Sequence, residues 1–324
     1  MPSIPPEVIA EVLAGYDLEP GRVRAVRKVL QVDTAAGPVC LKRVKDKYTT
    51  GNAWYVAQAT EHLLQAGCTR LPRILLTRQG GPVYVHAGRP WQVQAWLPGS
   101  KPDLSDPAVL AETARALADF HARSLGFCHR PPAIPAYRGG KLLEEFARKL
   151  RRFELLEGEA KSVFGKATAG LLHQAQAALA RLEASCYLEL YADALARGSL
   201  CHGDVLARNF LKGPAGKVYL IDLDRCFVEA PCADIWDLCY RGVKKRRAAA
   251  AVGTAVTAYA CVRPLSQGER DVLAALLSWP RKGLKVIFAC LRRKERRSKR
   301  GWEQELNRAI SFNIPLTKVD SLVL

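Results

Sequence analysis

The sequence predicts an α+β protein with two lobes: a small antiparallel β-sheet in the first, and mainly helices in the second. Short β-rich stretches occur before residue 97, whereas apolar residues recur at helical spacing after residue 103. The chain has 324 residues, of which 49% are hydrophobic, so it is long enough for two lobes with real cores. We place the first lobe at residues 1–97 and the second at residues 98–324.

The elements of the first lobe follow from apolar spacing and from turn residues. Apolar residues at helical spacing predict a helix over residues 3–15, and a second helix is predicted over residues 49–65. Five β-rich stretches are predicted as strands of one small sheet, at residues 23–32, 38–44, 73–77, 81–86 and 91–96. The sequence Leu97-Pro98-Gly99-Ser100 ends the sheet.

The second lobe is predicted to be helical on both sides of a short hairpin. An amphipathic helix over residues 103–124 carries His121 on its apolar face, where a packed histidine is a better interpretation than a catalyst. Further helices are predicted over residues 141–156, 170–196, 248–262, 267–279, 280–290 and 302–310.

Charge and cysteine content restrict the class of protein. There are 49 Lys and Arg residues against 31 Asp and Glu residues, a net charge of +18, with basic runs at residues 244–247 and 292–300. These runs predict either a solvated basic face or a surface for nucleic acid, an anionic coat or membrane surface, or phosphorylated substrates. The ten cysteines include no Cys-x-x-Cys pair, which argues against a zinc ribbon and for a reducing compartment.

No apolar run approaches the roughly 18 residues that a membrane-spanning helix needs. The first residues also lack the pattern of a signal peptide. We expect a cytoplasmic protein, or one that is deposited from the cytoplasm without a secretion signal.

The stretch over residues 199–224 carries the strongest functional pattern. Two apolar runs, 205–211 and 218–223, flank turn residues and predict a hairpin. Asp204 precedes the hairpin, Asn209 follows five residues later, and Asp222 comes at the end of the second run. Phosphoryl transfer needs a carboxylate to orient the attacking hydroxyl, and carboxylate and amide oxygens to hold Mg²⁺. The pattern therefore predicts phosphoryl transfer.

The order His202-Gly203-Asp204, then Asn209, then Ile221-Asp222 resembles the catalytic and metal segments of the aminoglycoside phosphotransferase and choline kinase-like superfamily. Within it, the sequence Tyr-Leu-Ile-Asp-Leu-Asp at 219–224 is most similar to the spore coat protein CotS family. The resemblance extends from about residue 20 to residue 310. It implies a protein kinase-like fold and an enzyme that uses ATP and Mg²⁺.

The resemblance also implies roles for individual residues. Asp204 would be the catalytic base, Asn209 and Asp222 the metal ligands, and Asp224 an additional carboxylate that binds metal or faces the substrate. His202 and Asp234 would be structural, with Asp234 accepting backbone hydrogen bonds from the catalytic loop.

The nucleotide site implied by the resemblance lies in the first lobe. Lys42 would contact the nucleotide phosphates with Glu61 as its partner, although a solvent-facing lysine and an exposed glutamate are the alternatives. Adenine would be contacted by backbone groups between the lobes, which are those of Gln94, Ala95, Trp96 and Leu97.

One stretch departs from the resembled pattern. Residues 22–28, where a glycine-rich loop would cover the phosphates, contain no glycine, and only Gly21 precedes them. Arg24, Arg27 or Lys28 could substitute as point charges. The expected function is therefore a phosphotransferase acting on a hydroxyl of a small molecule. The alternative is a catalytically weak or inactive coat or interaction protein, and the basic character argues against an aminoglycoside acceptor.

Overall fold

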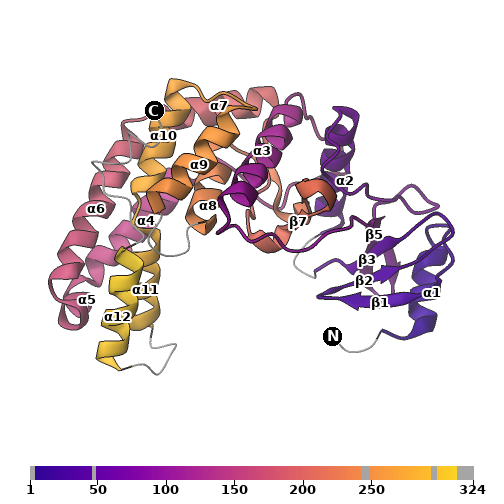
Figure 1. Cartoon of the computed structure of the whole chain (residues 1–324), viewed down its shortest axis with the longest axis horizontal. Coiled ribbons are helices and arrows are strands. Elements are labelled where there is room, and N and C mark those ends of the chain that lie inside the picture. Colours follow the sequence, from indigo (N-terminus) through magenta and orange to yellow (C-terminus); the bar gives the residue numbers. More distant parts are fainter. Residues whose placement is uncertain (1–3, 46–48, 243–247, 293–297, 312–324) are drawn as a thin grey trace.

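The computed structural model describes residues 4–45, 49–242, 248–292 and 298–311. It has a β-sheet part at the N-terminal side and a larger helical part that follows it (Figure 1). This arrangement confirms the predicted α+β class. The functional division at residue 97 stays a prediction.

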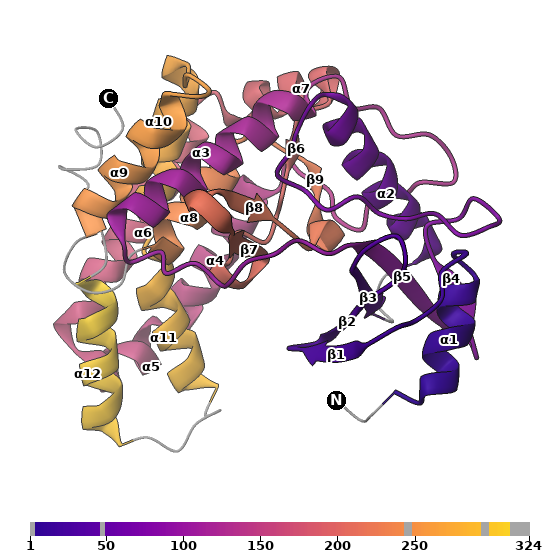
Figure 2. The same cartoon turned by 45° about the vertical axis from the view of Figure 1, so that its right-hand side comes forward.

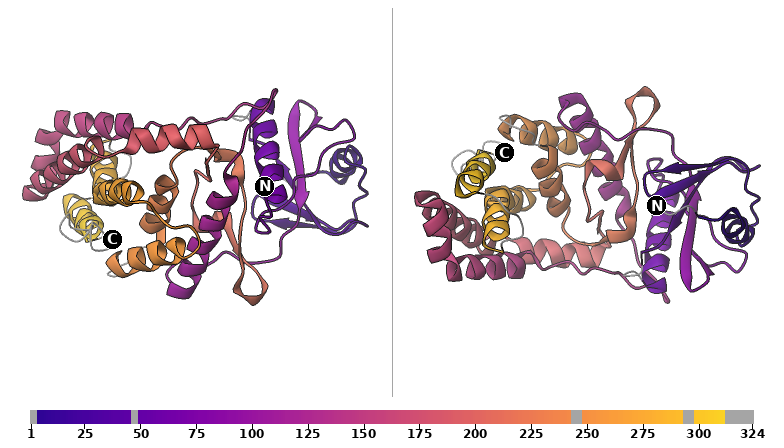
Figure 3. Two further views of the ribbon diagram at one scale, coloured as in Figure 1. Left: turned by 90° about the horizontal axis from the view of Figure 1, so that it is seen from above. Right: turned by 90° about the horizontal axis from the view of Figure 1, so that it is seen from below.

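The sheet of the N-terminal part is antiparallel throughout, with the order β1-β2-β3-β5-β4. Helix α1 (Pro6–Ala14) packs on its outer face, whereas α2 (Thr50–Gln65) lies between the sheet and the helical part (Figure 3). The strands are β1 (Val23–Val26), β2 (Val29–Val32), β3 (Val39–Arg43), β4 (Tyr84–His86) and β5 (Arg89–Ala95).

The structure corrects two of the predicted strands. Residues 23–32 form a hairpin, because Arg27 adopts a positive φ of 54° and permits a two-residue turn without glycine. Residues 73–77 contribute only a bridge from Ile74 to Gln94, since β4 occupies the rest of that edge of β5.

The short strands of the predicted catalytic segment lie on the side of the helical part that faces the N-terminal sheet (Figure 2). The predicted helix over 170–196 is broken at residues 184–186. There the Ser185 hydroxyl donates to the Leu182 carbonyl oxygen at 2.7 Å, which satisfies one of the last carbonyls of the first helix. The helices are α3 (Pro107–Ser124), α4 (Leu142–Leu155), α5 (Glu157–Phe164), α6 (Lys166–Glu183), α7 (Tyr187–Arg197), α8 (Cys232–Gly242), α9 (Ala248–Ala260), α10 (Gln267–Ser278), α11 (Arg281–Leu291) and α12 (Lys299–Ile310).

Two hydrophobic clusters stabilise the chain, and their boundary does not coincide with the edge of the sheet. The smaller cluster joins α1 to the sheet through residues such as Leu13 and Val93. The larger one fills the helical part and includes Val56 and Leu63 of α2. Helix α2 thus shares a core with the second part while it lies beside the sheet, and it ties the two together. Among the described helices, none is long and apolar enough to cross a membrane.

Candidate active site

The predicted hairpin forms and brings its polar ends together. Strands β7 (Phe210–Lys212) and β8 (Val218–Leu220) pair in antiparallel register, with Phe210 opposite Leu220. One step beyond, the Ile221 N–H donates to the Asn209 carbonyl oxygen at 2.9 Å. Asn209 and Asp222 therefore flank the base of one hairpin. Asp222 has a positive φ of 66°, a conformation that aspartate tolerates better than most residues.

The Asn209 side chain is anchored to Asp204. Its Nδ2 donates to the carbonyl oxygen of Asp204 at 2.8 Å and to the carboxylate Oδ2 at 3.0 Å. Because both partners are acceptors, the amide nitrogen must face Asp204, and the amide oxygen stays available for another group.

Lys42 joins the sheet to this hairpin. Its Nζ lies 2.8 Å from Oδ1 of Asp224 and 3.5 Å from Oδ1 of Asp222. Burial opposes the charge of Lys42, but the two carboxylates outweigh burial and raise the pKa of Lys42 above its ordinary value. Burial likewise opposes ionisation of Asp222, yet the charge of Lys42 lowers the pKa of Asp222 to about 2. For Asp224, burial outweighs Lys42 and raises the pKa.

Glu61 does not pair with Lys42, and this corrects the prediction. Its carboxylate contacts Arg73 NH1 at 3.1 Å and Nε2 of Gln65 at 3.0 Å on the exposed side of α2. The residue before it, Thr60, lines the small pocket beside Lys42. Successive residues of a helix point in directions that differ by about 100°, so Thr60 faces the pocket and Glu61 points away from it. The carboxylate that contacts Lys42 is that of Asp224 instead.

The pocket beside Lys42 lies between the sheet, α2 and the catalytic segment. Gln94 lines it, as does Gln92, whose buried Oε1 has no hydrogen-bond partner among the described residues. Trp96 is held beside the start of the neighbouring strand, because its backbone N–H donates to the Pro38 carbonyl oxygen at 3.1 Å. Ala95 pairs with Val39, whereas Leu97 lies just past the end of β5. Contacts of Gln94, Ala95, Trp96 and Leu97 with adenine stay a prediction.

The turn between β1 and β2 reaches the catalytic segment. Arg27, at the tip, donates from NH1 to the carbonyl oxygen of Arg208 at 3.3 Å, across 181 positions of the sequence. The short turn therefore lies over the residue that precedes Asn209. Arg24 instead bonds to Gln31 within the hairpin, so of these two arginines it is Arg27 that reaches the site.

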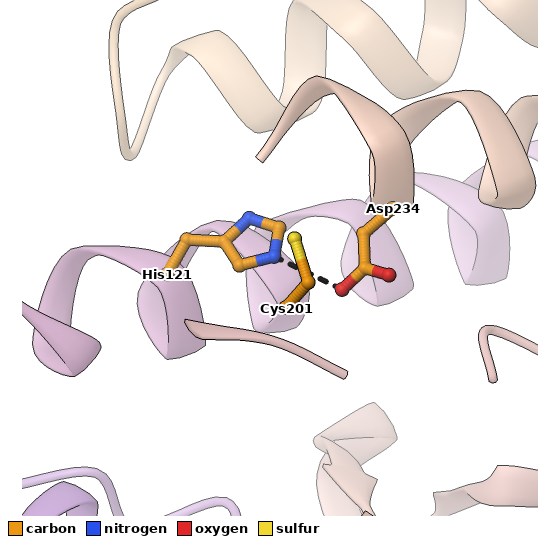
Figure 4. Close-up of side chains that lie close together, drawn as sticks. All are labelled: His121, Cys201 and Asp234. Atoms are coloured by element: carbon orange, nitrogen blue, oxygen red, sulfur yellow. Dashed lines mark hydrogen bonds and ion pairs between the residues drawn. The ribbon is translucent and has the colours of Figure 1, made fainter. Parts of the chain in front are cut away.

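Asp234 organises the backbone before Asp204, in the role that the resemblance implied. Its Oδ2 accepts from the His202 N–H at 2.5 Å and its Oδ1 from the Gly203 N–H at 3.1 Å. Nε2 of His121 is 3.1 Å from Oδ2 of Asp234 (Figure 4). Nδ1 of His121 is 2.7 Å from the Tyr259 hydroxyl. Burial opposes ionisation of Asp234, but the hydrogen bond and charge of His121 help to lower its pKa.

His202 also acts on this backbone. Its Nδ1 accepts from the Asp204 N–H at 3.3 Å, so its Nε2 carries the proton and donates to the Ile221 carbonyl oxygen at 3.0 Å. One neutral imidazole thus links the segments that hold Asp204 and Asp222.

Cys201 lies beside His121 and Asp234, and the ligand atoms of the three are within 4.8 Å of one another (Figure 4). Their chemistry does not suit a metal, because both carboxylate oxygens and both imidazole nitrogens already have partners. Burial also raises the pKa of the Cys201 thiol well above its ordinary value, which keeps it protonated. We interpret this cluster as structural.

The residues that fit a hard cation lie at the hairpin instead. Asp222 offers a carboxylate whose contact with Lys42 is long, and Asn209 offers an amide oxygen. Asp224 is close to both the lysine and Asp222. Oxygen donors of this kind suit Mg²⁺.

Two arginines beside Asp204 were not predicted. Arg208 NH2 lies 3.5 Å from Oδ2 of Asp204, and Arg225 NH1 lies 3.8 Å from Oδ1. The spacing of Arg208, four residues after Asp204, could have suggested the first contact. Arg225 comes near only through the fold.

This fold and cluster are those expected of a phosphotransferase with a kinase-like architecture. Residues 21–270 match the model of the phosphotransferase enzyme family, and the chain belongs to that family. The predicted phosphotransferase class is thereby confirmed.

Solved structures share the fold over nearly the whole chain. An aminoglycoside phosphotransferase from Alicyclobacillus acidocaldarius superposes with a TM-score of 0.82 at 20% identity, covering 100% of this chain and 97% of its own. An AMP-bound spectinomycin phosphotransferase gives 0.61 at 13% identity, covering 99% and 98%. An amicoumacin kinase in complex with AMP-PNP and Ca²⁺ gives 0.55 at 15% identity, covering 98% and 94%.

Proposed function

We propose that this protein transfers the γ-phosphoryl group of ATP to a hydroxyl group of a small molecule, with Mg²⁺ as cofactor. The observation that carries the proposal is the meeting of Lys42 with Asp222 and Asp224, at the base of the hairpin that also holds Asn209. The nucleotides bound to the spectinomycin and amicoumacin enzymes support an adenine nucleotide. Residues 1–97 would form the nucleotide-binding lobe and residues 98–324 the catalytic lobe.

Each residue would act through the geometry described above. Asp204 would orient the acceptor hydroxyl and accept its proton, with the carboxylate held in place by Asn209. Lys42 would exchange a carboxylate partner for the phosphates of the nucleotide. Asp222 and Asn209 would hold Mg²⁺, which would offset the negative charge of the phosphate groups.

Arg27 would supply the charge that a glycine-rich loop provides through backbone amides. It is placed over the catalytic segment by its bond to the Arg208 carbonyl oxygen. A guanidinium group can bind phosphate in bidentate fashion, so one side chain could serve at this position.

A test of the nucleotide site is the melting temperature of the full chain with ATP, in the presence and absence of Mg²⁺. At a ligand concentration 100 times Kd, binding stabilises a protein by about 2.7 kcal/mol, which corresponds to several degrees. We expect this stabilisation to require Mg²⁺ and to be lost in Asp222→Ala.

Glu61→Ala is the matched control, because Glu61 is also an acidic residue of this region but faces away from Lys42. It should keep the full Mg²⁺-dependent stabilisation. If ATP raised the melting temperature of Asp222→Ala as much as that of Glu61→Ala, the proposed metal site would be wrong.

A second candidate is a CotS-like spore coat component with weak or no catalysis. The observation that favours it is the two-residue β1–β2 turn, which has no glycine and is bonded to Arg208. Such a protein would bind its surface partners through the basic runs, of which residues 244–247 and 293–297 lie outside the described residues. A melting temperature that does not respond to saturating ATP and Mg²⁺ would favour this candidate.

A further inference from the structure

We infer that the acceptor carries an oxyanion, a carboxylate or a phosphate group, which Arg208 and Arg225 bind beside Asp204. This inference rests on the proposed phosphoryl transfer and specifies its substrate class. It predicts an anionic hydroxyl compound in place of an amine-bearing one.

Arg225 is held in place while its polar edge stays accessible. Its guanidinium carbon lies 4.8 Å from the centre of the Tyr137 ring, and NH1 lies 3.8 Å from Oδ1 of Asp204. Stacking on an aromatic ring fixes the plane of a guanidinium but leaves its N–H edge free to bind. The side chain is 44% exposed. The geometry suits a group that binds a ligand in the same place as the reacting hydroxyl.

Arg208 adds a second positive charge on the other oxygen of Asp204. Its NH2 lies 3.5 Å from Oδ2, and the side chain is 65% exposed. Two guanidinium groups thus face one carboxylate, so these three side chains together carry one positive charge in excess. An ammonium group bound here would be repelled, whereas a carboxylate or phosphate would neutralise the excess charge.

Other carboxylates near the catalytic segment already have partners. Glu229 is buried and accepts from the Gly140 N–H at 2.9 Å and the Tyr187 hydroxyl at 3.1 Å. Asp237 pairs with Arg281 at 2.6 Å. Asp222 and Asp224 both contact Lys42. Each of the four carboxylates would therefore have to leave its present partner before it could bind a cationic acceptor.

The same arginines could instead contact the γ-phosphate of ATP, and kinetics separate the two cases. In the reaction, the bond between the γ-phosphorus and the bridging oxygen of ADP breaks, a new bond forms to the acceptor oxygen, and the hydroxyl proton passes to Asp204. Loss of an acceptor-binding arginine raises the KM of the acceptor, whereas loss of a γ-phosphate contact raises the KM of ATP.

The experiment uses two matched sets of acceptors in which only the charged group changes. The smaller set is D-glycerate, glycerol 3-phosphate, glycerol and 3-aminopropane-1,2-diol. The larger set is D-gluconate, D-glucose 6-phosphate, D-glucose and D-glucosamine. Transfer of labelled phosphate from ATP to each compound is measured with the full chain and Mg²⁺, and the two anions of each set distinguish a carboxylate site from a phosphate site.

We expect an anionic member of at least one set to have a kcat/KM about ten-fold or more above its uncharged analogue, with the amine lowest. Arg225→Gln should raise the KM of that anion about ten-fold or more and leave the KM of ATP within about two-fold. Arg225→Lys, which keeps the charge, should retain part of the preference. Arg197→Gln is the control, because this exposed arginine lies on α7 and its ion pair among the described residues is with Asp193.

Three results would overturn the inference: a preference for the uncharged or amine compounds, no product from any anion, or an Arg225→Gln effect on the KM of ATP alone. Mg²⁺-dependent stabilisation by ATP, measured on the same preparation, then distinguishes a wrong acceptor class from a wrong proposed function. If it persists, the proposed phosphotransferase stands and only the acceptor class is wrong. If it is absent, the proposed function itself fails.

Discussion

Asp204→Asn is expected to lower the turnover number of phosphoryl transfer by about 10²–10⁴-fold, the usual contribution of a general base. The substitution preserves the shape of the side chain but removes the charge that accepts the hydroxyl proton. The affinity for ATP should change little, because Lys42 and Asp222 are unaltered. The rate of γ-phosphoryl transfer to a substrate and the KM of ATP are the two quantities to measure.

The control for this variant is Asp193→Asn, which makes the same chemical change on the exposed face of α7. It should retain the wild-type rate. If Asp204→Asn also turned over at the wild-type rate, Asp204 would not be the base, and the proposed mechanism would have to be abandoned.

Asp234→Ala is expected to destabilise the protein by roughly 3–5 kcal/mol, because three buried donors lose their acceptor and each costs about 1–3 kcal/mol. Three donors lose their acceptor: the backbone N–H groups of His202 and Gly203, and Nε2 of His121. Burial lowers the pKa of His121, which favours the neutral imidazole, so the expected cost comes from the unsatisfied donors. The free energy of unfolding in urea measures the loss.

Asp193→Ala again provides the comparison, because its contact with Arg197 is an exposed pair within one helix. Such a pair contributes less than about 1 kcal/mol. A cost for Asp234→Ala that is no larger than this would mean that the backbone before Asp204 does not depend on the buried carboxylate.

The sequence predicted those parts of the site that depend on local spacing. Asp204 and Asn209 lie on one short loop, and the β7–β8 hairpin brings Asp222 back to Asn209, so the pattern over residues 204–222 was enough. Asp234 accepts the two hydrogen bonds from the loop backbone that the resemblance implied for it. The two short strands of the hairpin follow from its two apolar runs and from the turn residues between them.

The sequence was least informative where the outcome depends on helix phase or on distant contacts. Glu61 and Thr60 differ by one position, and periodicity alone did not tell which of them faces Lys42. The bond from Arg27 to Arg208 joins residues 181 positions apart, and Arg225 reaches Asp204 only because the segment after Asp222 folds against the catalytic loop. No local pattern encodes these approaches.

Asp222 and Asn209 are proposed to hold a divalent cation together with the nucleotide. Electron paramagnetic resonance of Mn²⁺, a substitute for Mg²⁺, reports the fraction of the ion that is bound. With AMP-PNP present, we expect tight binding of Mn²⁺ to the wild-type chain, and loss of this binding in both Asp222→Ala and Asn209→Ala. Equal binding by the wild-type chain and the two variants, or no dependence on the nucleotide, would contradict this proposal.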